Sequence, residues 1–335
     1  MKRRFIALQM EKIDFEQALS SLLTGCMGLR KGESCLVVCD TSRKSLGSSV
    51  FEAAKQITDR VNLFAVRVPG PEGWQPDTLS LLEKEMLTQD VILLLTGVSL
   101  SHTDARRRAV KRGARLASMP GITAEMLKRA AQADYGVISK RSERLKAILT
   151  DADSISVETE LGTAIRFSVE GMQGHMEDGL YNRAGTWGNM PAGETCIGPK
   201  EGSAEGVLVI DWSMSAIGPL EKPLIIQVEG GRAIEIKGKQ ATALQGRLSP
   251  FGRAAFTVAE FAMGTNGWAQ LSGVVLEDEK VCGTAHFALG NNISFGGATD
   301  VPIHLDGVLR APTVTVDGMR IMERGHLLSK GGNNE

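Results

Sequence analysis

Residues 35–40 read CLVVCD, and this stretch decides how the first half of the chain folds. The run is apolar up to its last residue, and it lies between Lys31-Gly32 and the polar stretch 41–45. A short apolar run bounded in this way is typical of a strand that is buried on both faces, as in a parallel sheet. A helix is predicted to follow it over residues 48–57.

The pattern of a buried strand followed by a helix repeats along the first 150 residues. Further strands are predicted over 62–68, 90–96 and 115–119, and the last of them precedes a helix over 123–132. Strands that alternate with helices predict a parallel sheet with helices on its faces. We therefore predict an N-terminal α/β domain over residues 1–150. Neither of the common glycine-rich phosphate-binding motifs occurs in it.

After residue 149 the pattern changes to short strands. Residues 154–159 and 164–169 flank a turn at 160–163, which indicates a hairpin. Further strand-like runs occur at 207–210, 224–228 and 233–236, and residues 253–261 are the main helix candidate. Residues 151–330 are predicted to form a β-rich α+β domain with mostly antiparallel strands. Residues 330–335 are expected to be a disordered tail.

Composition excludes several classes of function. The chain has 335 residues, of which 42% are hydrophobic and 23% charged, and its formal net charge is −1. This balance predicts no nucleic-acid partner and no membrane partner. No apolar run is long enough to cross a membrane. The five cysteines are an odd number without metal-finger spacing, so a reducing cytoplasm is expected.

Two histidines near the C-terminus are candidate metal ligands. His304 and Asp306 are two residues apart, so on a strand they share one face and could reach the same ion. His286 lies upstream in an otherwise apolar run, and the flexible stretch 294–297 separates it from His304. An isolated histidine in an apolar run is more often a core residue, and that alternative stays open at this point.

Two glutamates strengthen the case for a metal site. Glu194 lies in the turn-rich segment 187–194, and Glu260 has apolar neighbours on both sides. Burying a carboxylate is costly unless it is paired or bound to a metal. The alternative is that each glutamate caps a turn or pairs with an arginine.

Four ordered segments resemble the thermophilic-type metallo-aminopeptidases, also called the aminopeptidase T-like family. They are GNMPAGE (188–194), AEFAMGTN (259–266), EDEKVCGTAHFALG (277–290) and HLD (304–306). Residues 99–106 are similar to the N-terminal domain of that family. The resemblance implies a metal-dependent hydrolase, an aminopeptidase that releases N-terminal residues from short peptides, and a homodimer.

The resemblance also implies a two-metal centre. The residues that match the family's ligands are Glu194, Glu260, His286, His304 and Asp306. Carboxylates and imidazoles suit zinc, with cobalt or manganese as alternatives. The neighbouring Glu279 or Asp278 is expected either to assist as a base or to lie in a solvated acidic turn.

One departure from the family pattern weakens the peptidase interpretation. The family carries a tyrosine seven residues after the ligand that matches His286, where this chain has Ile293. The only tyrosines are Tyr135 and Tyr181, and nothing in the sequence places Tyr181 in that role.

Two rival interpretations therefore stay open. One is an iron-dependent dioxygenase of the dihydroxypyridine type, with His286, His304 and Asp306 as iron ligands, although the histidine spacing of that enzyme is not found here. The other is a metal-binding relic without catalysis.

Overall fold

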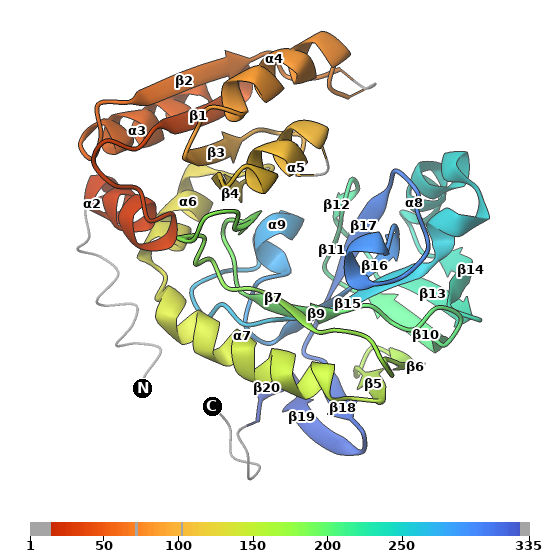
Figure 1. Ribbon diagram of the computed structural model, residues 1–335. Helices are drawn as coiled ribbons and strands as arrows, with labels where there is room; N and C mark the ends of the chain where they lie inside the picture. The colour runs from red at the N-terminus through yellow and green to blue at the C-terminus, as the bar shows by residue number, and fades with distance from the viewer. Residues whose placement is uncertain (1–14, 71–72, 102, 329–335) are drawn as a thin grey trace. The chain divides into compact units, whose positions relative to one another are not determined.

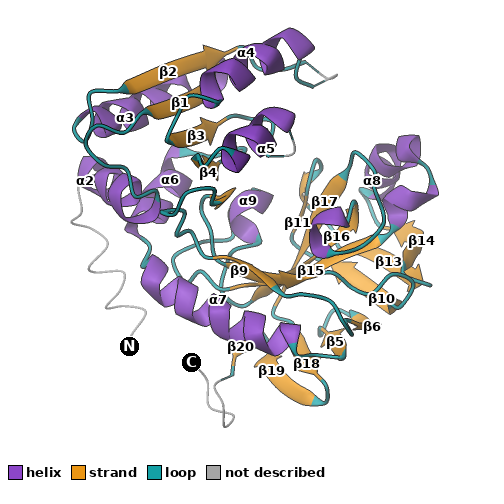
Figure 2. Ribbon diagram, viewed as in Figure 1, coloured by secondary structure: helices purple, strands orange, loops and turns teal. Residues whose placement is uncertain are grey.

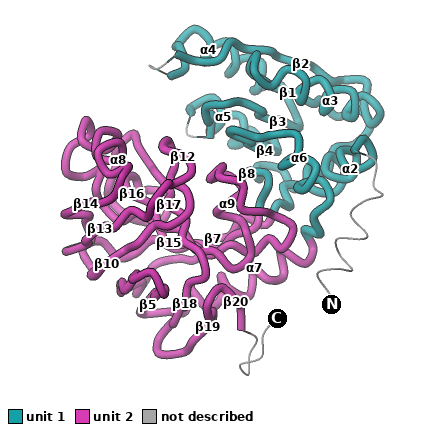
Figure 3. Tube along the Cα trace, turned by 180° about the vertical axis from the view of Figure 1, so that it is seen from behind, with its two compact units in different colours: residues 1–135, 179–192 teal, residues 136–178, 193–335 magenta. Residues whose placement is uncertain are grey.

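The computed structural model describes residues 15–70, 73–101 and 103–328 (Figure 1). Its contacts divide the chain into two compact units (Figure 3). Unit 1 comprises the residues up to Tyr135 together with Gly179–Ala192, and unit 2 comprises Gly136–Asp178 and the residues from Gly193 onward. The expected tail at 330–335 and His102 of the segment 99–106 lie outside the described residues.

Unit 1 is a parallel sheet with helices on its faces. Its sheet has the strand order β2-β1-β3-β4-β8, and all four of its pairings are parallel. The elements are α2 (Phe15–Ser21), the π-helix η1 (Leu22–Cys26), β1 (Cys35–Asp40), the 3₁₀ helix η2 (Thr41–Arg43), α3 (Lys44–Lys55), β2 (Val61–Val66), α4 (Pro76–Met86), β3 (Val91–Leu95), α5 (Asp104–Lys111), β4 (Arg115–Ser118), α6 (Ala124–Gln132) and β8 (Trp187–Asn189).

The central strands of unit 1 have the burial that the sequence predicted. Every residue of β1 and of β3 is buried, because helices cover both faces of the sheet. Leu36 and Ile92 belong to the core that also takes in Leu82 of α4 and Ala109 of α5. On the other face α3 lies so close to β1 that a Cβ on Gly47 would come within 2.7 Å of Cys39 Sγ. The prediction of an N-terminal parallel α/β region is confirmed.

Unit 2 consists mainly of strands (Figure 2). Its helical elements are α7 (Tyr135–Thr150), α8 (Ala241–Leu248), α9 (Val275–Asp278) and the 3₁₀ helices η3 (Ser249–Phe251), η4 (Arg253–Phe256) and η5 (Ile293–Phe295). Its strands are β5 (Ser154–Glu158), β6 (Ala164–Ser168), β7 (His175–Glu177), β9 (Glu194–Ile197), β10 (Glu205–Ile210), β11 (Ser213–Met214), β12 (Gly218–Pro219), β13 (Leu224–Glu229), β14 (Arg232–Lys237), β15 (Val258–Gly264), β16 (Thr284–Gly290), β17 (His304–Arg310), β18 (Thr313–Val316), β19 (Met319–Glu323) and β20 (His326–Leu327).

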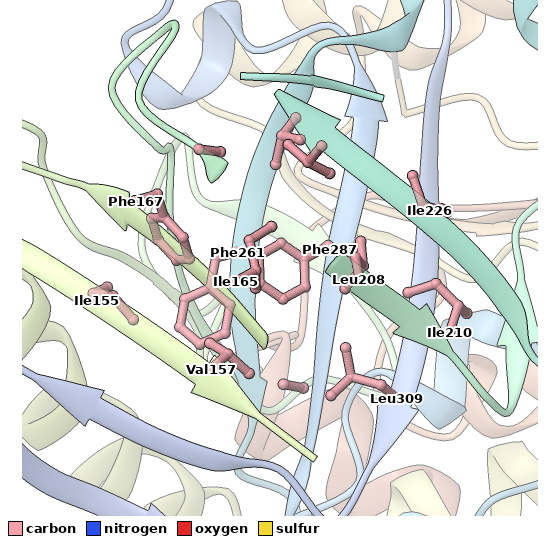
Figure 4. Close-up of a cluster of buried hydrophobic side chains, with 14 of the residues drawn as sticks. Ile155, Val157, Ile165, Phe167, Leu208, Ile210, Ile226, Phe261, Phe287 and Leu309 are labelled. Carbon is pink, nitrogen blue, oxygen red and sulfur yellow. The ribbon is translucent and has the colours of Figure 1, made fainter. Parts of the chain in front are cut away.

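These strands form two antiparallel sheets that enclose one core. One sheet has the order β14-β13-β10-β6-β5-β18-β19-β20, and the other has the order β12-β11-β17-β16-β15-β9-β7. Phe167 of the first sheet packs against Phe261 and Phe287 of the second, with ring centroids 5.4 and 5.8 Å apart (Figure 4). The predicted β-rich C-terminal region, including its hairpin at β5 and β6, is confirmed.

The helix predicted over residues 253–261 is wrong. Only Arg253–Phe256 is helical, as a 3₁₀ turn, and strand β15 follows at Val258–Gly264. All seven residues of β15 are buried. A strand that is buried on both faces does not show the alternation of polar and apolar residues by which a strand is recognised in a sequence. The α-helix that precedes this segment in the sequence is α8, which ends at Leu248.

The compact units differ from the ranges 1–150 and 151–330 in two places. Helix α7 is grouped with unit 2 from Gly136 on, and residues 179–192 are grouped with unit 1. The second difference arises because β8 returns to pair with β4 and extends the parallel sheet. Separate folding of two domains that meet at residue 150 stays a prediction.

Among the described residues, no helix is long and apolar enough to cross a membrane.

Candidate metal centre

The candidate ligands lie on one face of the seven-stranded sheet of unit 2. Phe261 and Met263 of β15 point into the core. Glu260 and Ala262, which alternate with them along the strand, therefore point to the opposite face. The register places Ala262 beside His286 of β16, and Ala288 beside Asp306 of β17. Ala288 also pairs with Glu260, and Gly290 pairs with His304, so each donor has an alanine or a glycine as a cross-strand neighbour, which leaves room for the donor side chains.

Glu194 reaches the same face from β9. It is paired with Gly264 at the end of β15, and Gly193 immediately precedes it. Gly193 has φ of +126°, and a Cβ there would come within 2.6 Å of Asn266 Cβ. The glycine is therefore required for the chain to enter β9 at this place. Sheet register explains how residues from four strands, far apart in sequence, come together.

The distances between these side chains suit ligands of a common ion. His304 Nε2 lies 3.0 Å from Glu260 Oε2 and 3.1 Å from Asp306 Oδ1, and His286 Nε2 lies 3.6 Å from Glu260 Oε1. Two donors in adjacent positions around one ion, each about 2.0–2.2 Å from it, are separated by roughly 3.0–3.4 Å. Glu260 thus directs one oxygen toward each imidazole.

Two overlapping groups of donors share Asp306. One consists of Glu260, His304 and Asp306, and the other consists of Glu279, His286 and Asp306; within each group the donor atoms lie within 4.8 Å of one another. The structure therefore brings the predicted residues together and adds Glu279. That they bind a metal stays a prediction.

The electrostatics of the centre also favour a cation. Burial alone lowers the pKa of His304, but the carboxylates of Asp306 and Glu260 outweigh burial and raise it well above its usual value. For His286, burial is likewise outweighed by Glu260 and Glu194, and its pKa is raised to about 9. A divalent ion would supply the positive charge that protons on these imidazoles otherwise provide.

The buried carboxylate of Glu194 gives a separate test of the fit. Its Oε2 atom is buried without a hydrogen-bond partner among the described residues, and it lies 3.8 Å from His286 Nε2. The other oxygen of Glu194 pairs with Lys280 at 2.6 Å, and burial raises the pKa of this carboxyl to about 8 despite that lysine. A buried polar oxygen without a partner is costly, and a metal ion would provide one. The donor set therefore fits a metal ion.

His304 is held by a hydrogen bond at one edge of its ring and by an aromatic contact on one face. Its Nδ1 donates to the carbonyl of Asn291 at 2.8 Å, so Nε2 is the nitrogen that faces the carboxylates. The ring of Phe295 stacks on the imidazole with centroids 5.7 Å apart, and it meets His175 edge-on at 6.2 Å. Asn291 and Phe295 both belong to the connection between β16 and β17. Glu201 holds this connection in place by accepting hydrogen bonds from Asn292 Nδ2 and from the Ala298 N–H.

The candidate ligands differ in how far they are exposed to solvent. The side chains of His304 and Asp306 are 16% and 19% exposed, whereas those of His286 and Glu260 are 2% and 5% exposed. A ligand that enters the site would therefore meet His304 and Asp306 first.

A parallel α/β unit and a β-rich unit that carries a cluster of carboxylate and imidazole donors define the fold class and a candidate metal centre. Residues 14–329 match the NicX family, described as 2,5-dihydroxypyridine 5,6-dioxygenase. The chain belongs to this family.

Individual relatives agree with this assignment. A 2,5-dihydroxypyridine 5,6-dioxygenase from Pseudomonas putida (strain KT2440) is 24% identical over 316 residues, which cover 84% of this chain and 87% of the relative. A solved structure of 2,5-dihydroxypyridine dioxygenase from Pseudomonas putida KT2440 superposes with a TM-score of 0.79 at 19% identity, over 95% of this chain and 99% of that one. Wild-type AmpT from Thermus thermophilus superposes with a TM-score of 0.70 at 15% identity, over 94% and 99% of the two chains. At these identities the two structures show the fold alone.

The assignment to the aminopeptidase T-like family is wrong, and so is the expectation of an aminopeptidase, a hydrolase or a protease. The segments behind that assignment include strands β9, β15, β16 and β17, so they report a scaffold that AmpT shares. Donor residues indicate a candidate metal site, but they do not select the reaction. The match over residues 14–329 outweighs the histidine spacing that argued against the dioxygenase.

The structure places the remaining candidates plainly. Ile293 is 49% exposed on the connection between β16 and β17. Tyr181 lies in unit 1, where its hydroxyl donates to the carbonyl of Asn189. Glu279 and Asp278 are buried, so the solvated acidic turn is also wrong.

Sequence reasoning missed Lys280, Glu177, His175 and Phe295. Lys280 is 1% exposed and lies within 2.6 Å of Glu194, 2.9 Å of Glu279 and 3.2 Å of Glu177. The sequence EDEK at 277–280 could have indicated it, since α9 buries the first two of these acidic residues as well.

Proposed function

We propose that this chain is a ferrous-iron dioxygenase that opens the ring of a dihydroxypyridine or a closely similar hydroxylated heteroaromatic compound. The observation that carries the proposal is the convergence of His286, Glu260, His304 and Asp306 in a member of this family. The curated relative and one of the solved structures carry the name of the same dioxygenase, which supports the substrate class.

Iron replaces the zinc expected from the sequence. Asp306 is shared by a group that contains His304 and a group that contains His286. An ion bound by Asp306 and both imidazoles would have the donor set that non-haem ferrous oxygenases use, and the two histidines would have to move closer together to bind it. Glu260, which lies near both imidazoles, would contribute a further oxygen. Ferrous iron held there would supply a centre at which molecular oxygen and a hydroxylated ring can be brought together.

The protein's own residues would orient the ring and limit the access of water. The ring would enter beside His304 and Asp306, because the far side of the site is buried. Phe295 provides an aromatic wall against His304, and His175 adds an imidazole at the edge of that wall. Burial and, to a smaller extent, Lys146 lower the pKa of His175 despite the opposing effect of Glu260. His175 therefore holds a proton less readily than a free imidazole does.

Oxygen consumption tests the proposal directly. Metal-free protein would be loaded with ferrous iron without oxygen and then mixed with 2,5-dihydroxypyridine in oxygenated buffer. We expect equimolar loss of oxygen and of the ring's absorbance, and both atoms of labelled oxygen should appear in the product by mass spectrometry.

Two controls make the outcome specific. Protein loaded with zinc should consume no oxygen, and 2-hydroxypyridine, which lacks the second hydroxyl, should be turned over poorly. Iron binding without oxygen uptake on any dihydroxypyridine would contradict the proposal and favour the non-catalytic relic. A cytoplasmic location is proposed with it, since all five cysteines are free.

A further inference from the structure

The two donor groups of the centre differ in their contact with Lys280. Lys280 pairs with Glu279, a member of the group Glu279–His286–Asp306, at 2.9 Å. Its closest carboxylate is Glu194 Oε1 at 2.6 Å, whose other oxygen faces His286. Its third partner, Glu177, belongs to neither group. The ion pairs of Lys280 therefore lie on the His286 side of the centre.

The position of Lys280 is fixed by its backbone. Its N–H donates to the carbonyl of Glu277 at 3.0 Å, and its own carbonyl accepts from the N–H of Asn266 at 2.9 Å. The side chain is 1% exposed, so water does not screen the ammonium charge from its surroundings. Three carboxylates meet at its Nζ, which fixes the direction of the side chain as well.

We propose that Lys280 is a built-in cation that limits the centre to one divalent ion per chain. An ion bound by Glu279, His286 and Asp306 would compete with the ammonium for Glu279 and would be repelled by its charge. The group Glu260–His304–Asp306 shares none of the carboxylates that bind Lys280. The ion is therefore held on the His304 side, while Lys280 pairs with Glu194 and Glu279 on the His286 side.

Lys280 acts here through carboxylates and not on the substrate, so it is a positioning residue. The inference goes beyond the proposed reaction, because it concerns how many ions bind and holds whether or not a ring is opened. Ion counting tests Lys280, and oxygen uptake tests the function, so the two can fail separately.

The experiment titrates the metal-free full-length protein with Mn(II) alone. Bound ions are counted by equilibrium dialysis with elemental analysis, and electron paramagnetic resonance distinguishes an isolated Mn(II) from a spin-coupled pair. We expect one Mn(II) per wild-type chain and the spectrum of an isolated ion. In Lys280→Met we expect two ions and the spectrum of a coupled pair, and in Lys280→Arg, which keeps the charge, one.

Other variants keep the test decisive if Lys280→Met does not fold. Lys280→Met combined with Glu177→Gln removes one of the three carboxylates around Lys280 together with the lysine and should bind two ions. Glu279→Gln in the otherwise unchanged chain should still bind one ion, with an affinity within about threefold of wild type. Two ions in the wild-type protein, one ion in a folded Lys280→Met, or loss of the ion in Glu279→Gln would each overturn the role of Lys280. Absence of any bound ion in the wild type would overturn it together with the metal centre.

Discussion

At the scale of single residues, the centre depends on how each imidazole is oriented. His304 is held through Nδ1 by the Asn291 carbonyl and across its face by Phe295, and its Nε2 faces two carboxylates. Such contacts align a ligand before the ion arrives, which reduces the entropy lost on binding. His304 is therefore the residue whose removal should affect the metal most directly.

We expect His304→Ala to weaken ferrous-iron binding by at least about 100-fold, since loss of a ligand should exceed the 10–100-fold cost of losing an outer contact. The iron content of protein purified in the presence of ferrous iron measures the effect, and oxygen uptake should be lost with it. His326→Ala is the matched control, because His326 is an exposed histidine on β20. If His304→Ala retains wild-type iron content, His304 is not a ligand.

At the scale of secondary-structure elements, strand β15 joins the core to the centre. Phe261 and Met263 fill the core, while Glu260 faces the donors from the other side of the same strand. Gly264 ends the strand beside Glu194, at a point where another backbone segment approaches closely. A Cβ at Gly264 would come within 2.1 Å of the carbonyl oxygen of Val281, which cannot rotate away.

Gly264→Ala should therefore lower the free energy of unfolding by about 1–3 kcal/mol, the usual cost of overpacking. Gly246→Ala is the matched control: Gly246 lies in helix α8 with nothing within 4 Å of its added Cβ. That substitution should raise stability by about 0.4–1 kcal/mol. Urea unfolding measures both, and an equal effect of the two alanines would contradict the steric argument.

Strand β1 of unit 1 ends in a carboxylate that ties it to the end of β3. Asp40 is inaccessible to solvent and accepts hydrogen bonds from the Ser42 hydroxyl at 2.5 Å, from Gly97 N and from Ser42 N at 2.9 Å. Burial raises the pKa of Asp40, but these bonds and Arg43 outweigh it and hold the pKa below the model-peptide value of 3.8.

The depressed pKa of Asp40 makes its contribution to stability dependent on pH. That contribution is complete above the pKa of the unfolded chain and is lost as the pH falls through the lower pKa of the folded state. Asp40→Asn should therefore destabilise unit 1 at neutral pH and have a smaller effect in acid. Urea unfolding of both proteins across the acidic range gives the difference, and a difference independent of pH would refute this role of the carboxylate.

At the scale of the whole molecule, each unit has a hydrophobic core of its own, and the candidate centre belongs to unit 2 alone. A ligand that binds only the folded state stabilises it by about 2.7 kcal/mol at a concentration 100 times its dissociation constant. Removing the metal with a chelator should therefore destabilise unit 2 selectively. Amides of β15, β16 and β17 should exchange hydrogen faster, and amides of β1 and β3 should not change. If hydrogen exchange became equally faster in both units, the metal would not act on unit 2 selectively.

The homodimer implied by the sequence stays a proposal for the complete protein. We expect light scattering to give twice the chain mass of 35.9 kDa. A mass of one chain, independent of concentration, would exclude the dimer.

The sequence alone predicted the fold class and, through the resemblance, the five candidate ligands Glu194, Glu260, His286, His304 and Asp306. The run 35–40 specified a buried strand because six residues with almost no polar atoms can be covered only between two layers. His304 and Asp306 could be paired in advance because a strand places residues two apart on one face. The helix expected at 253–261 failed because β15 is buried on both faces, and such a strand lacks alternation.

Only the tertiary structure decided which side chains share a charge. Lys280 and Glu279 are neighbours in an acidic stretch that reads as a surface turn, yet both are buried against Glu194, more than eighty residues away. Their partners follow from the register of β9 with β15 and from the approach of α9, which are long-range contacts that no local pattern encodes. The reaction could not be predicted from the donor residues either, because the same carboxylates and imidazoles suit hydrolysis at zinc or oxygen chemistry at iron.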